Sequence, residues 1–474
     1  MKTIARVILL LLSAIPALAQ QKITMLQATE MALQNNITIK QAEFSQAVSS
    51  IDLLESKMAL YPDLNANASE NFNFGRSIDP LTNQFVNERV NSNNFSLSSN
   101  VLLFGGLQRI QTISRNKLLL EASKSGLQKT KNEILLSVVN FYLQALYFED
   151  LLTAANARKS VSAEEYDRAL KREKVGNITL GDVLNVKAQL AAEELNVITA
   201  QNNLDIAMIN LTQLIDRDMS KKYSLERAAN LEVADEQIEK NVSVLYGEAV
   251  KVYPEVVQAE YNTQASIKAI QIAKGGYYPR LSLGASIGTG YSSGRGSFSF
   301  LPRGFGEQYV GSTRANDSVF IAQAIVEQQF LKTDYFDQLN DNVNQSIGFN
   351  LSIPIFNNWN TRLNVRRTKI NQQSSALNEE LIKNNLNKLI TQSVADINAA
   401  EKKYVSAGDA FRSLSESFKY NQQKFDVGLL SSVDFNTVKS NLSRTEADFI
   451  QSKYDLIFKR KILDFYLGKP LNLN

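Results

Sequence analysis

Two long segments without proline constrain this chain more than any other feature of its sequence. Leu107 to Lys174 and Trp359 to Asp426 are each 68 residues long, and each contains a single glycine, Gly126 or Gly408. Because proline interrupts α-helices and glycine weakens them, these segments predict long continuous helices. At about 1.5 Å per residue, each helix would extend for roughly 100 Å. A helix of this length does not fit comfortably within a compact soluble domain.

The two segments belong to a tandem repeat that covers most of the chain. Tyr61-Pro62-Asp63-Leu64 recurs as Tyr278-Pro279-Arg280-Leu281, and from Phe104 onward the landmarks recur 252 residues later, beginning with Phe356. The two Tyr-Pro landmarks are only 217 residues apart, so the second copy contains 35 additional residues between tyrosine and phenylalanine. The constant register beyond phenylalanine indicates that the length of the helices is mechanically important.

A seven-residue hydrophobic pattern occupies the returning segment of each copy. The positions are Val183, Leu190, Val197, Leu204 and Leu211, and then Phe435, Leu442, Phe449, Leu456 and Leu463. A strict seven-residue repeat keeps one seam against a partner helix when the two helices supercoil. We therefore predict two antiparallel coiled-coil hairpins, with a pair of ordinary core helices as the alternative.

Four segments between the helices alternate apolar and polar residues with a period of two, which is typical of β-strands with one apolar face. They are residues 64–74, 95–103, 281–287 and 347–355. Strands of about 9–13 residues are long enough to cross an outer membrane at a tilt. Aromatic residues lie near the strand ends, where a membrane interface is expected. These aromatic residues are Phe104, Tyr277, Tyr278, Tyr291 and Phe356.

The segments that connect the paired strands, 75–93 and 292–342, are polar, and the second contains five glycines, so we expect loops on the outer side. Most of the 35 additional residues fall in the second of them. Four strands cannot close a barrel, and an open sheet edge cannot be left in lipid, so several chains must share one barrel. The alternative, a soluble four-stranded sheet packed on helices, leaves the long helices unexplained.

The N-terminus has the pattern of a secretory signal peptide. Lys2 and Arg6 precede an apolar run from Val7 to Leu12, and Ala17-Leu18-Ala19 forms a small-x-small cleavage site. This run is too short to span a membrane. Together with the repeat, it divides the chain into five parts. They are a signal peptide, 1–19; a first repeat, 20–215; a connecting segment, 216–241; a second repeat, 242–467; and a C-terminal tail, 468–474.

The composition excludes most enzyme mechanisms. The chain contains neither cysteine nor histidine, so it cannot form disulfides, thiolate or histidine catalysis, or zinc and haem sites built on those ligands. We predict that the protein is not an enzyme and has no catalytic residues, no metal site and no cofactor. The formal net charge of +3 argues against a nucleic-acid partner.

The order of these features resembles the TolC-like outer-membrane efflux proteins over essentially the entire mature chain. The resemblance rests on the repeated helix, strand, strand, long helix, turn, helix order, on the Tyr61 and Tyr278 motifs, and on the strand exits at Phe104 and Phe356. It implies a homotrimer with a twelve-stranded barrel in outer-membrane lipid and a helical tunnel in the periplasm. It also implies a passive exit duct of a tripartite efflux or type I secretion system. The implied partners are a periplasmic adaptor and an inner-membrane pump of the resistance-nodulation-division or ATP-driven type.

Both helical hairpins end in a turn that is a natural docking point for an adaptor. The predicted docking residues are Val175, Gly176, Asn177, Ile178 and Asp182 in the first turn, and Val427, Gly428, Leu429, Leu430 and Ser431 in the second. Exposed apolar residues there could meet the helical tips of the adaptor. Plain helix capping is the alternative, because each glycine suits a helix C-terminus and Asp182 suits a capping box.

The resemblance also implies a gate at the periplasmic mouth. Asp434 matches an acid that lines the closed mouth, where a ring of carboxylates favours cations. The second acid of that pattern is Thr437 here, Leu430 replaces a gate-locking arginine, and Phe425 replaces a tyrosine of the same lock. The gate would then be held by apolar packing of Leu430 and Phe425.

A different class of function remains open from the sequence alone. A surface-anchored structural or adhesive coiled coil would share the long helices but would not need alternating strands beside them. The sequence does not specify the cargo, which could be a drug, a metal ion or a polypeptide.

Overall fold

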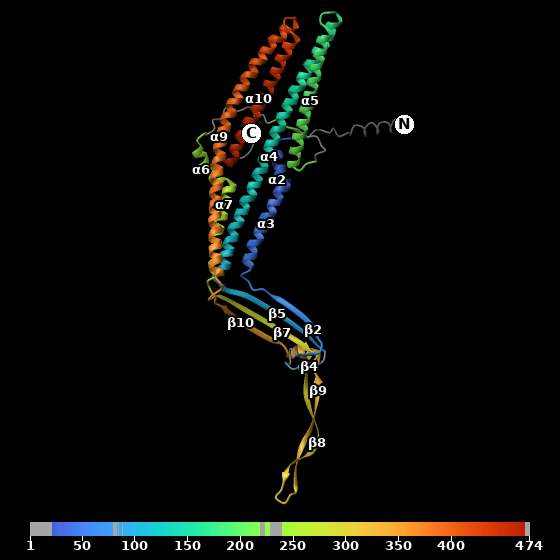
Figure 1. Ribbon diagram of the computed structural model, residues 1–474, viewed down its shortest axis with the longest axis vertical. Coiled ribbons are helices and arrows are strands. Elements are labelled where there is room, and N and C mark those ends of the chain that lie inside the picture. The colour runs from blue at the N-terminus through green and yellow to red at the C-terminus, as the bar shows by residue number, and fades with distance from the viewer. Residues whose placement is uncertain are drawn as a thin grey trace, which may run out of the picture. The chain divides into compact units, whose positions relative to one another are not determined.

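The computed structural model describes residues 21–78, 83, 85–87, 89–218, 223–227 and 239–469 (Figure 1). The predicted signal peptide lies outside these residues, as do most of the connecting segment and residues 470–474 of the tail. The chain forms two compact units. One, the helical unit, comprises residues 1–52, 116–266 and 371–474, and the other, the strand unit, comprises residues 53–115 and 267–370.

Long helices dominate the chain, as the proline-free segments predict. The helices are α2 (Met25–Asn35), α3 (Ile37–Met58), α4 (Gln108–Lys174), α5 (Leu180–Leu214), α6 (Val242–Val252), α7 (Pro254–Gly275), α8 (Tyr335–Asp341), α9 (Asn360–Asp426) and α10 (Ser432–Tyr466). The α4 and α9 helices are each 67 residues long, and α5 and α10 are each 35 residues long. The equal lengths in the two copies confirm the structural repeat.

Four strands form one antiparallel sheet in the order β10-β7-β5-β2. The strands are β2 (Asn65–Asn73), β5 (Val90–Gly105), β7 (Arg280–Ser292) and β10 (Asn344–Ser352). This sheet confirms the four strands predicted from the alternating segments. The outer strands β2 and β10 each pair on one side only, so the sheet has two open edges. An unpaired strand edge offers a row of backbone donors and acceptors to another chain.

The segment 292–342 differs from the predicted loop. It contains a long antiparallel hairpin of β8 (Gly296–Ser312) and β9 (Ser318–Lys332), followed by α8. The alternation in β8 is hidden in the sequence because the register shifts twice, between Pro302 and Gly304 and between Tyr309 and Gly311. Such bulges reverse which residues face each side of a strand. A shorter hairpin of β3 (Arg76–Ile78) and β4 (Phe85–Asn87) lies within the segment 75–93.

The junction between strand and helix has the same strained conformation in both copies. Two consecutive residues before each long helix have positive φ angles, Gly106 (60°) and Leu107 (62°) in the first copy and Asn358 (52°) and Trp359 (65°) in the second. This region of backbone space is open to glycine but is unusual for a bulky side chain. A Cβ atom at Gly106 would lie only 2.3 Å from the carbonyl oxygen of Gly275. The first junction therefore requires glycine for close packing of two backbones.

The helical unit has its main core around the middle of α4. Val138, Val139 and Leu146 are buried there beside residues of α2 and α5. The hydroxyl of Tyr142 hydrogen-bonds the carbonyl oxygens of Ile23 (3.0 Å) and Glu226 (2.6 Å), and burial raises the pKa of Tyr142 to about 12. Among the described residues, α4 is the helix that is long and apolar enough to cross a membrane by composition. This helix contributes Val138, Val139 and Leu146 to the core.

The two short strands near this core connect the ends of the first repeat. β1 (Gln21–Ile23) pairs in parallel with β6 (Tyr223–Leu225), residue by residue. This pairing places part of the predicted connecting segment 216–241 against Gln21–Ile23. The division into repeats and connecting segment remains a prediction.

Polar contacts establish the order of the helices within the helical unit as α3, α4, α7 and α9. Lys131 of α4 pairs with Glu43 of α3 at 3.2 Å, and Lys129 of α4 pairs with Glu255 of α7 at 3.0 Å. On the other side of α7, Lys383 of α9 pairs with Glu260 at 2.8 Å. The chain connects these helices to β2, β5, β7 and β10, which have the same order in the sheet.

Candidate functional site

The first predicted docking turn joins α4 to α5 and is closed by backbone hydrogen bonds. The N–H of Gly176 donates to the carbonyl oxygen of Glu173 (2.8 Å), and the N–H of Asn177 donates to that of Arg172 (2.9 Å). This pair of bonds is the Schellman motif, in which glycine occupies the left-handed position; φ of Gly176 is 77°. The capping role that the sequence predicts for Gly176 is therefore present.

The second turn, between α9 and α10, repeats this geometry. Gly428 has a φ angle of 78°, and its N–H donates to the carbonyl oxygen of Phe425 at 3.1 Å, while the N–H of Leu429 donates to that of Lys424 at 2.8 Å. Ser431 is the N-cap of α10 and accepts a hydrogen bond from the backbone N–H of Asp434. Equivalent turns in the two copies follow from the constant register of the repeat.

Apolar side chains at both turns are largely exposed. Val175 is 70% exposed, Val427 is 71% exposed and Leu429 is 78% exposed. Ile178 and Leu430 are half-buried, and Asn177 is exposed. Isolated apolar residues are common on protein surfaces, whereas adjoining ones mark interaction sites more often. Two turns of the same architecture, each with exposed aliphatic residues, form the candidate docking site.

The two aspartates after the turns have different surroundings. Asp182 completes a capping box with Thr179, whose backbone N–H and hydroxyl donate to Oδ2 of Asp182 at 3.1 and 2.8 Å. The side-chain hydrogen bond from Thr179 lowers the pKa of Asp182, and the backbone hydrogen bond contributes in the same direction. Asp434 is exposed and accepts from the Ser431 hydroxyl at 2.7 Å. Helix capping accounts for the contacts of both aspartates, so these contacts do not by themselves indicate a role in gating.

Phe425, predicted for the gate, packs inside its own hairpin. Its ring stacks on that of Phe435 at a centroid distance of 4.4 Å with an interplanar angle of 5°. Phe418 of α9 also stacks on Phe435, and Tyr404 and Phe411 both stack on Phe449. These aromatic residues of α9 are seven positions apart, a pattern that the spacing of apolar residues on α10 alone does not reveal.

Thr437 lines a groove between the N-terminal parts of α5 and α10. The lining residues are Asn185, Val433, Asn436, Thr437, Ser440 and Asn441. The Thr437 hydroxyl is also bonded to the carbonyl oxygen of Val433 at 3.0 Å. The groove brings together the two hairpins near their turns, and it is lined by amides, hydroxyls and the side chain of Val433. Neither Asp182 nor Asp434 lines it.

A buried polar contact that the sequence does not reveal links the two hairpins. Lys439 of α10 donates to the Ser162 hydroxyl at 2.7 Å and to Oε2 of Glu165 at 2.9 Å, both on α4. The side chains of Lys439 and Glu165 are 5% and 7% exposed. Nearby, Arg158 of α4 pairs with Glu446 of α10 at 2.6 Å. These residues lie 274 or more positions apart in the chain, so no local sequence pattern points to their contact.

No group of histidine, cysteine, aspartate and glutamate in the described residues could hold a metal ion. The described features form a pair of helical hairpins with exposed apolar turns and an antiparallel sheet with two open edges. They define the fold class of outer-membrane channel subunits, in which a helical hairpin pair and a few strands are contributed by each chain. The comparisons with known proteins identify the family.

The chain belongs to the outer membrane efflux protein family, whose model matches residues 28–217 and 245–469. It is 23% identical to the outer membrane protein TolC of Escherichia coli over 466 residues, which is 96% of this chain and 84% of TolC. The CmeC outer membrane channel of Campylobacter jejuni has the same fold, with a TM-score of 0.75 and 16% identity over 94% of this chain and 85% of CmeC. The open state of the MtrE outer membrane channel of Neisseria gonorrhoeae gives a TM-score of 0.72 and 14% identity over 94% and 89% of the two chains.

The family membership confirms the TolC-like resemblance, the two-repeat fold class and the outer-membrane location. It identifies the protein as an efflux channel component, and its named relatives are channels rather than enzymes. The docking and gate residues are not tested by the comparisons and remain predictions.

Proposed function

We propose that the protein is the passive exit duct of a tripartite efflux or type I secretion system and carries out no chemistry of its own. Three copies would close a twelve-stranded barrel in the outer membrane and continue as a helical tunnel in the periplasm. A periplasmic adaptor would dock at the hairpin turns and connect the duct to an inner-membrane pump of the resistance-nodulation-division or ATP-driven type.

This proposal rests on two kinds of surface that the single chain leaves open, namely the edges of the sheet and the apolar seams of two helices. The sheet has open edges at β2 and β10. The helices that continue from those strands, α3 and α9, also leave an apolar seam exposed at seven-residue intervals. The seam residues are Ile37, Phe44, Ile51 and Met58 on α3, and Leu363, Ile370 and Leu377 on α9. A seven-residue apolar seam is the surface by which one helix packs on another.

Assembly with further copies of the chain would cover the sheet edges and the helix seams together. The β2 edge of one chain would pair with the β10 edge of the next, and the α3 seam would pack on the α9 seam of the same neighbour. A single chain that acted as an adhesive coiled coil would leave the edges of β2 and β10 open. An open sheet edge in lipid leaves backbone groups without hydrogen bonds. The channel is therefore favoured over the structural or adhesive alternative.

The exposed turns support adaptor docking. Val175 of the first turn and Val427 and Leu429 of the second are each at least 70% exposed. Burial of these aliphatic side chains against apolar residues of a helical adaptor tip would be favourable by the hydrophobic effect. The Schellman bonds of Gly176 and Gly428 hold the backbone of each turn in one conformation, which reduces the entropic cost of docking.

The gate is proposed to lie near the start of α10. Asp434 is exposed, and in a ring of three chains its carboxylates would concentrate negative charge and favour cations. Substitution of Asp434 by asparagine would then reduce the cation preference of single channels. An unchanged conductance and ion preference in Asp434→Asn would remove this residue from the gate.

Two measurements test the duct as a whole. The native mass of the mature protein in mild detergent, corrected for bound detergent, is expected to equal three chains. In cells, the V427D/L429D variant is expected to lose export while its amount in the outer membrane is unchanged. V405D is the control, because Val405 is an exposed valine of α9 that lies far from the turn at the end of this helix. A folded monomer that is soluble without detergent, or full export by V427D/L429D, would contradict the proposal.

A further inference from the structure

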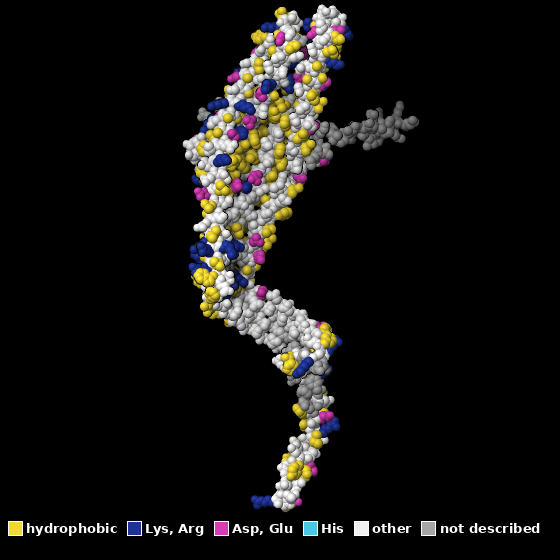
Figure 2. All heavy atoms as spheres, in the orientation of Figure 1, with side chains coloured by type: hydrophobic (Ala, Val, Ile, Leu, Met, Phe, Trp, Pro, Cys, Tyr) yellow, Lys and Arg dark blue, Asp and Glu magenta, His cyan; other side chains and the backbone are white. Residues whose placement is uncertain are grey.

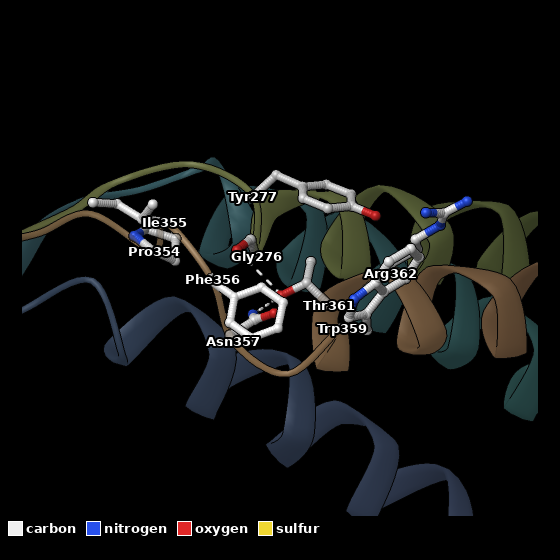
Figure 3. A pocket seen from close by; sticks show the side chains of 9 residues that line it. All are labelled: Gly276, Tyr277, Pro354, Ile355, Phe356, Asn357, Trp359, Thr361 and Arg362. Atoms are coloured by element: carbon white, nitrogen blue, oxygen red, sulfur yellow. Dashed lines mark hydrogen bonds between the residues drawn. The ribbon is translucent and has the colours of Figure 1, made fainter.

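A pocket lies at the junction of strand and helix in the second repeat, within the strand unit (Figure 3). It is formed by the turn between α7 and β7, by the linker between β10 and α9, and by the first turn of α9. Its lining includes Tyr277, Pro354, Ile355, Phe356, Trp359 and Arg362. Figure 3 shows the Tyr277 ring and the Arg362 guanidinium on the same side of the pocket.

The pocket exposes apolar side chains of the linker between β10 and α9. Ile355 continues the alternation of Ile347, Phe349, Leu351 and Ile353 along and beyond β10, and it is 95% exposed. The polar residues of β7 and β10 alternate with this set and face the opposite side. Arg280 and Arg367 line a neighbouring pocket with Gln108, which shares Gly276 and Thr361 with the first pocket. In a membrane barrel the apolar face is the lipid face, so the apolar residues of β10 that lead to Ile355 would border lipid in the proposed channel.

Three cations extend from the pocket along one face of α9. Arg362, Arg366 and Lys369 are separated by four and three residues, so they lie on the same side of the helix. All three are exposed, and none forms an ion pair with a carboxylate in the part of the chain that the structure describes. Basic side chains on this part of the surface are visible beside the apolar residues in Figure 2. Within the described residues, no carboxylate pairs with this positive charge.

Trp359 holds the innermost cation in place. The Arg362 guanidinium lies 4.2 Å from the centroid of the Trp359 ring, which is within the range of a cation–π contact. Trp359 itself has a φ angle of 65°, a conformation that a bulky residue adopts only where its surroundings require it. The strained backbone projects the indole ring at the boundary between strand and helix, where tryptophan favours a membrane interface.

We propose that this pocket binds an anionic phospholipid of the periplasmic leaflet. The phosphate would lie against Arg362 and Arg366, with the Tyr277 hydroxyl as a further donor, and Lys369 would add long-range attraction. The acyl chains would cover Pro354, Ile355 and Phe356. A lipid satisfies both features of the site, because one molecule brings a negative headgroup next to apolar chains. The inference rests on the outer-membrane position of the strands and does not depend on an adaptor or a pump.

The single tryptophan of the chain makes the site directly measurable. The purified full-length protein in detergent would be titrated with phosphatidylglycerol that carries brominated acyl chains, which quench a nearby indole on contact. Brominated phosphatidylcholine is the comparison lipid, because its headgroup has no net charge. Phosphatidylglycerol is expected to reach half of its quenching at an about tenfold lower mole fraction, since several cations face the headgroup.

The R362Q/R366Q/K369Q variant should lose the difference between the two lipids. A matched control, K402Q/K403Q/R412Q, removes the same charge from exposed positions of the same helix and should keep the difference. R362K should also keep most of it, which separates lost charge from misfolding. Elution of each variant at the wild-type size verifies the assembly.

Three outcomes would overturn the proposal. They are equal quenching by both lipids in the wild type, an unchanged preference in the triple variant, and no quenching by either lipid, which would mean that another subunit covers Trp359. Displacement of the lipid by inorganic phosphate at equal concentration would identify a phosphate site instead of a lipid site. Because this assay contains only the protein and lipid, its failure would leave the duct proposal untouched.

Discussion

At the scale of single residues, the buried contact between Lys439 and Glu165 is the most sensitive link between the two hairpins. Both side chains are nearly inaccessible, so a charge left without its partner cannot be hydrated. Replacement of Lys439 by methionine is expected to cost about 3–5 kcal/mol in unfolding free energy. The E165M/K439M double variant should recover most of this loss, because it removes both charges. Urea unfolding followed by helical circular dichroism measures each value, and a double variant as unstable as K439M would contradict this account.

The capping box of Asp182 should make the first turn sensitive to acid. Its hydrogen bonds with Thr179 lower the pKa of Asp182 from its ordinary value of 3.8. A carboxyl whose pKa is lower in the folded state stabilises that state above its unfolded pKa, and this contribution is lost as the pH falls through the folded pKa. Amide hydrogen exchange, corrected for the intrinsic rate, should therefore show the start of α5 opening below about pH 4. D182N should show no such transition, and a transition that survives in D182N would assign it to another group.

At the scale of elements, aromatic stacking distinguishes the second hairpin from the first. Phe435 is 1% exposed and lies between Phe418 and Phe425. F435A is expected to destabilise the contact of α9 with α10 by about 3–5 kcal/mol, because it removes a buried aromatic ring. V183A, at the equivalent position of the first hairpin, removes less apolar surface and should have a smaller effect. Amide hydrogen exchange near each turn measures the effects of F435A and V183A separately. Equal losses of amide protection in the two variants would contradict the role of stacking.

The elements also indicate which parts of the fold the sequence can predict. The α4 and α9 helices follow from the absence of proline, and the strands β7 and β10 follow from a plain period of two. The sequence predicts a loop where the β8–β9 hairpin lies. Two register shifts interrupt the alternation of apolar and polar residues, and glycines in this segment are typical of turns. The local sequence also gives no sign that Trp359 adopts a left-handed conformation, since that depends on the tight junction between strand and helix.

The candidate site was predictable to a smaller extent. The turns at Gly176 and Gly428 follow from glycine and capping signals within a few residues of each other. By contrast, the contacts of Lys439 require α4 and α10 to meet, and Phe425 turns inward because α9 presents aromatic residues every seven positions. The contacts of Lys439 depend on tertiary packing, and the orientation of Phe425 depends on a pattern divided between two helices. Assembly-level roles, such as that of Asp434, depend on surfaces that a single chain leaves open.

At the scale of the whole molecule, assembly should depend on the α3 seam as much as on the sheet edges. Phe44 and Ile51 are exposed in the single chain, and in the proposed trimer they pack on α9 of the next copy. F44D/I51D would place two carboxylates in this apolar contact, where burial of an unpaired charge is costly. The variant is therefore expected to give monomers by native mass in mild detergent, under conditions in which the unmodified protein gives trimers.

A neighbouring position provides the control for this last prediction. Ser45 is exposed on α3 but lies about 100° around the helix from Phe44. S45D adds a charge to the same helix outside the seam, so its trimer should be retained. If S45D and F44D/I51D dissociate equally, the effect comes from added charge and not from the seam. If F44D/I51D remains trimeric, α3 does not form the contact between chains, and closure of the ring would have to come from the sheet edges alone.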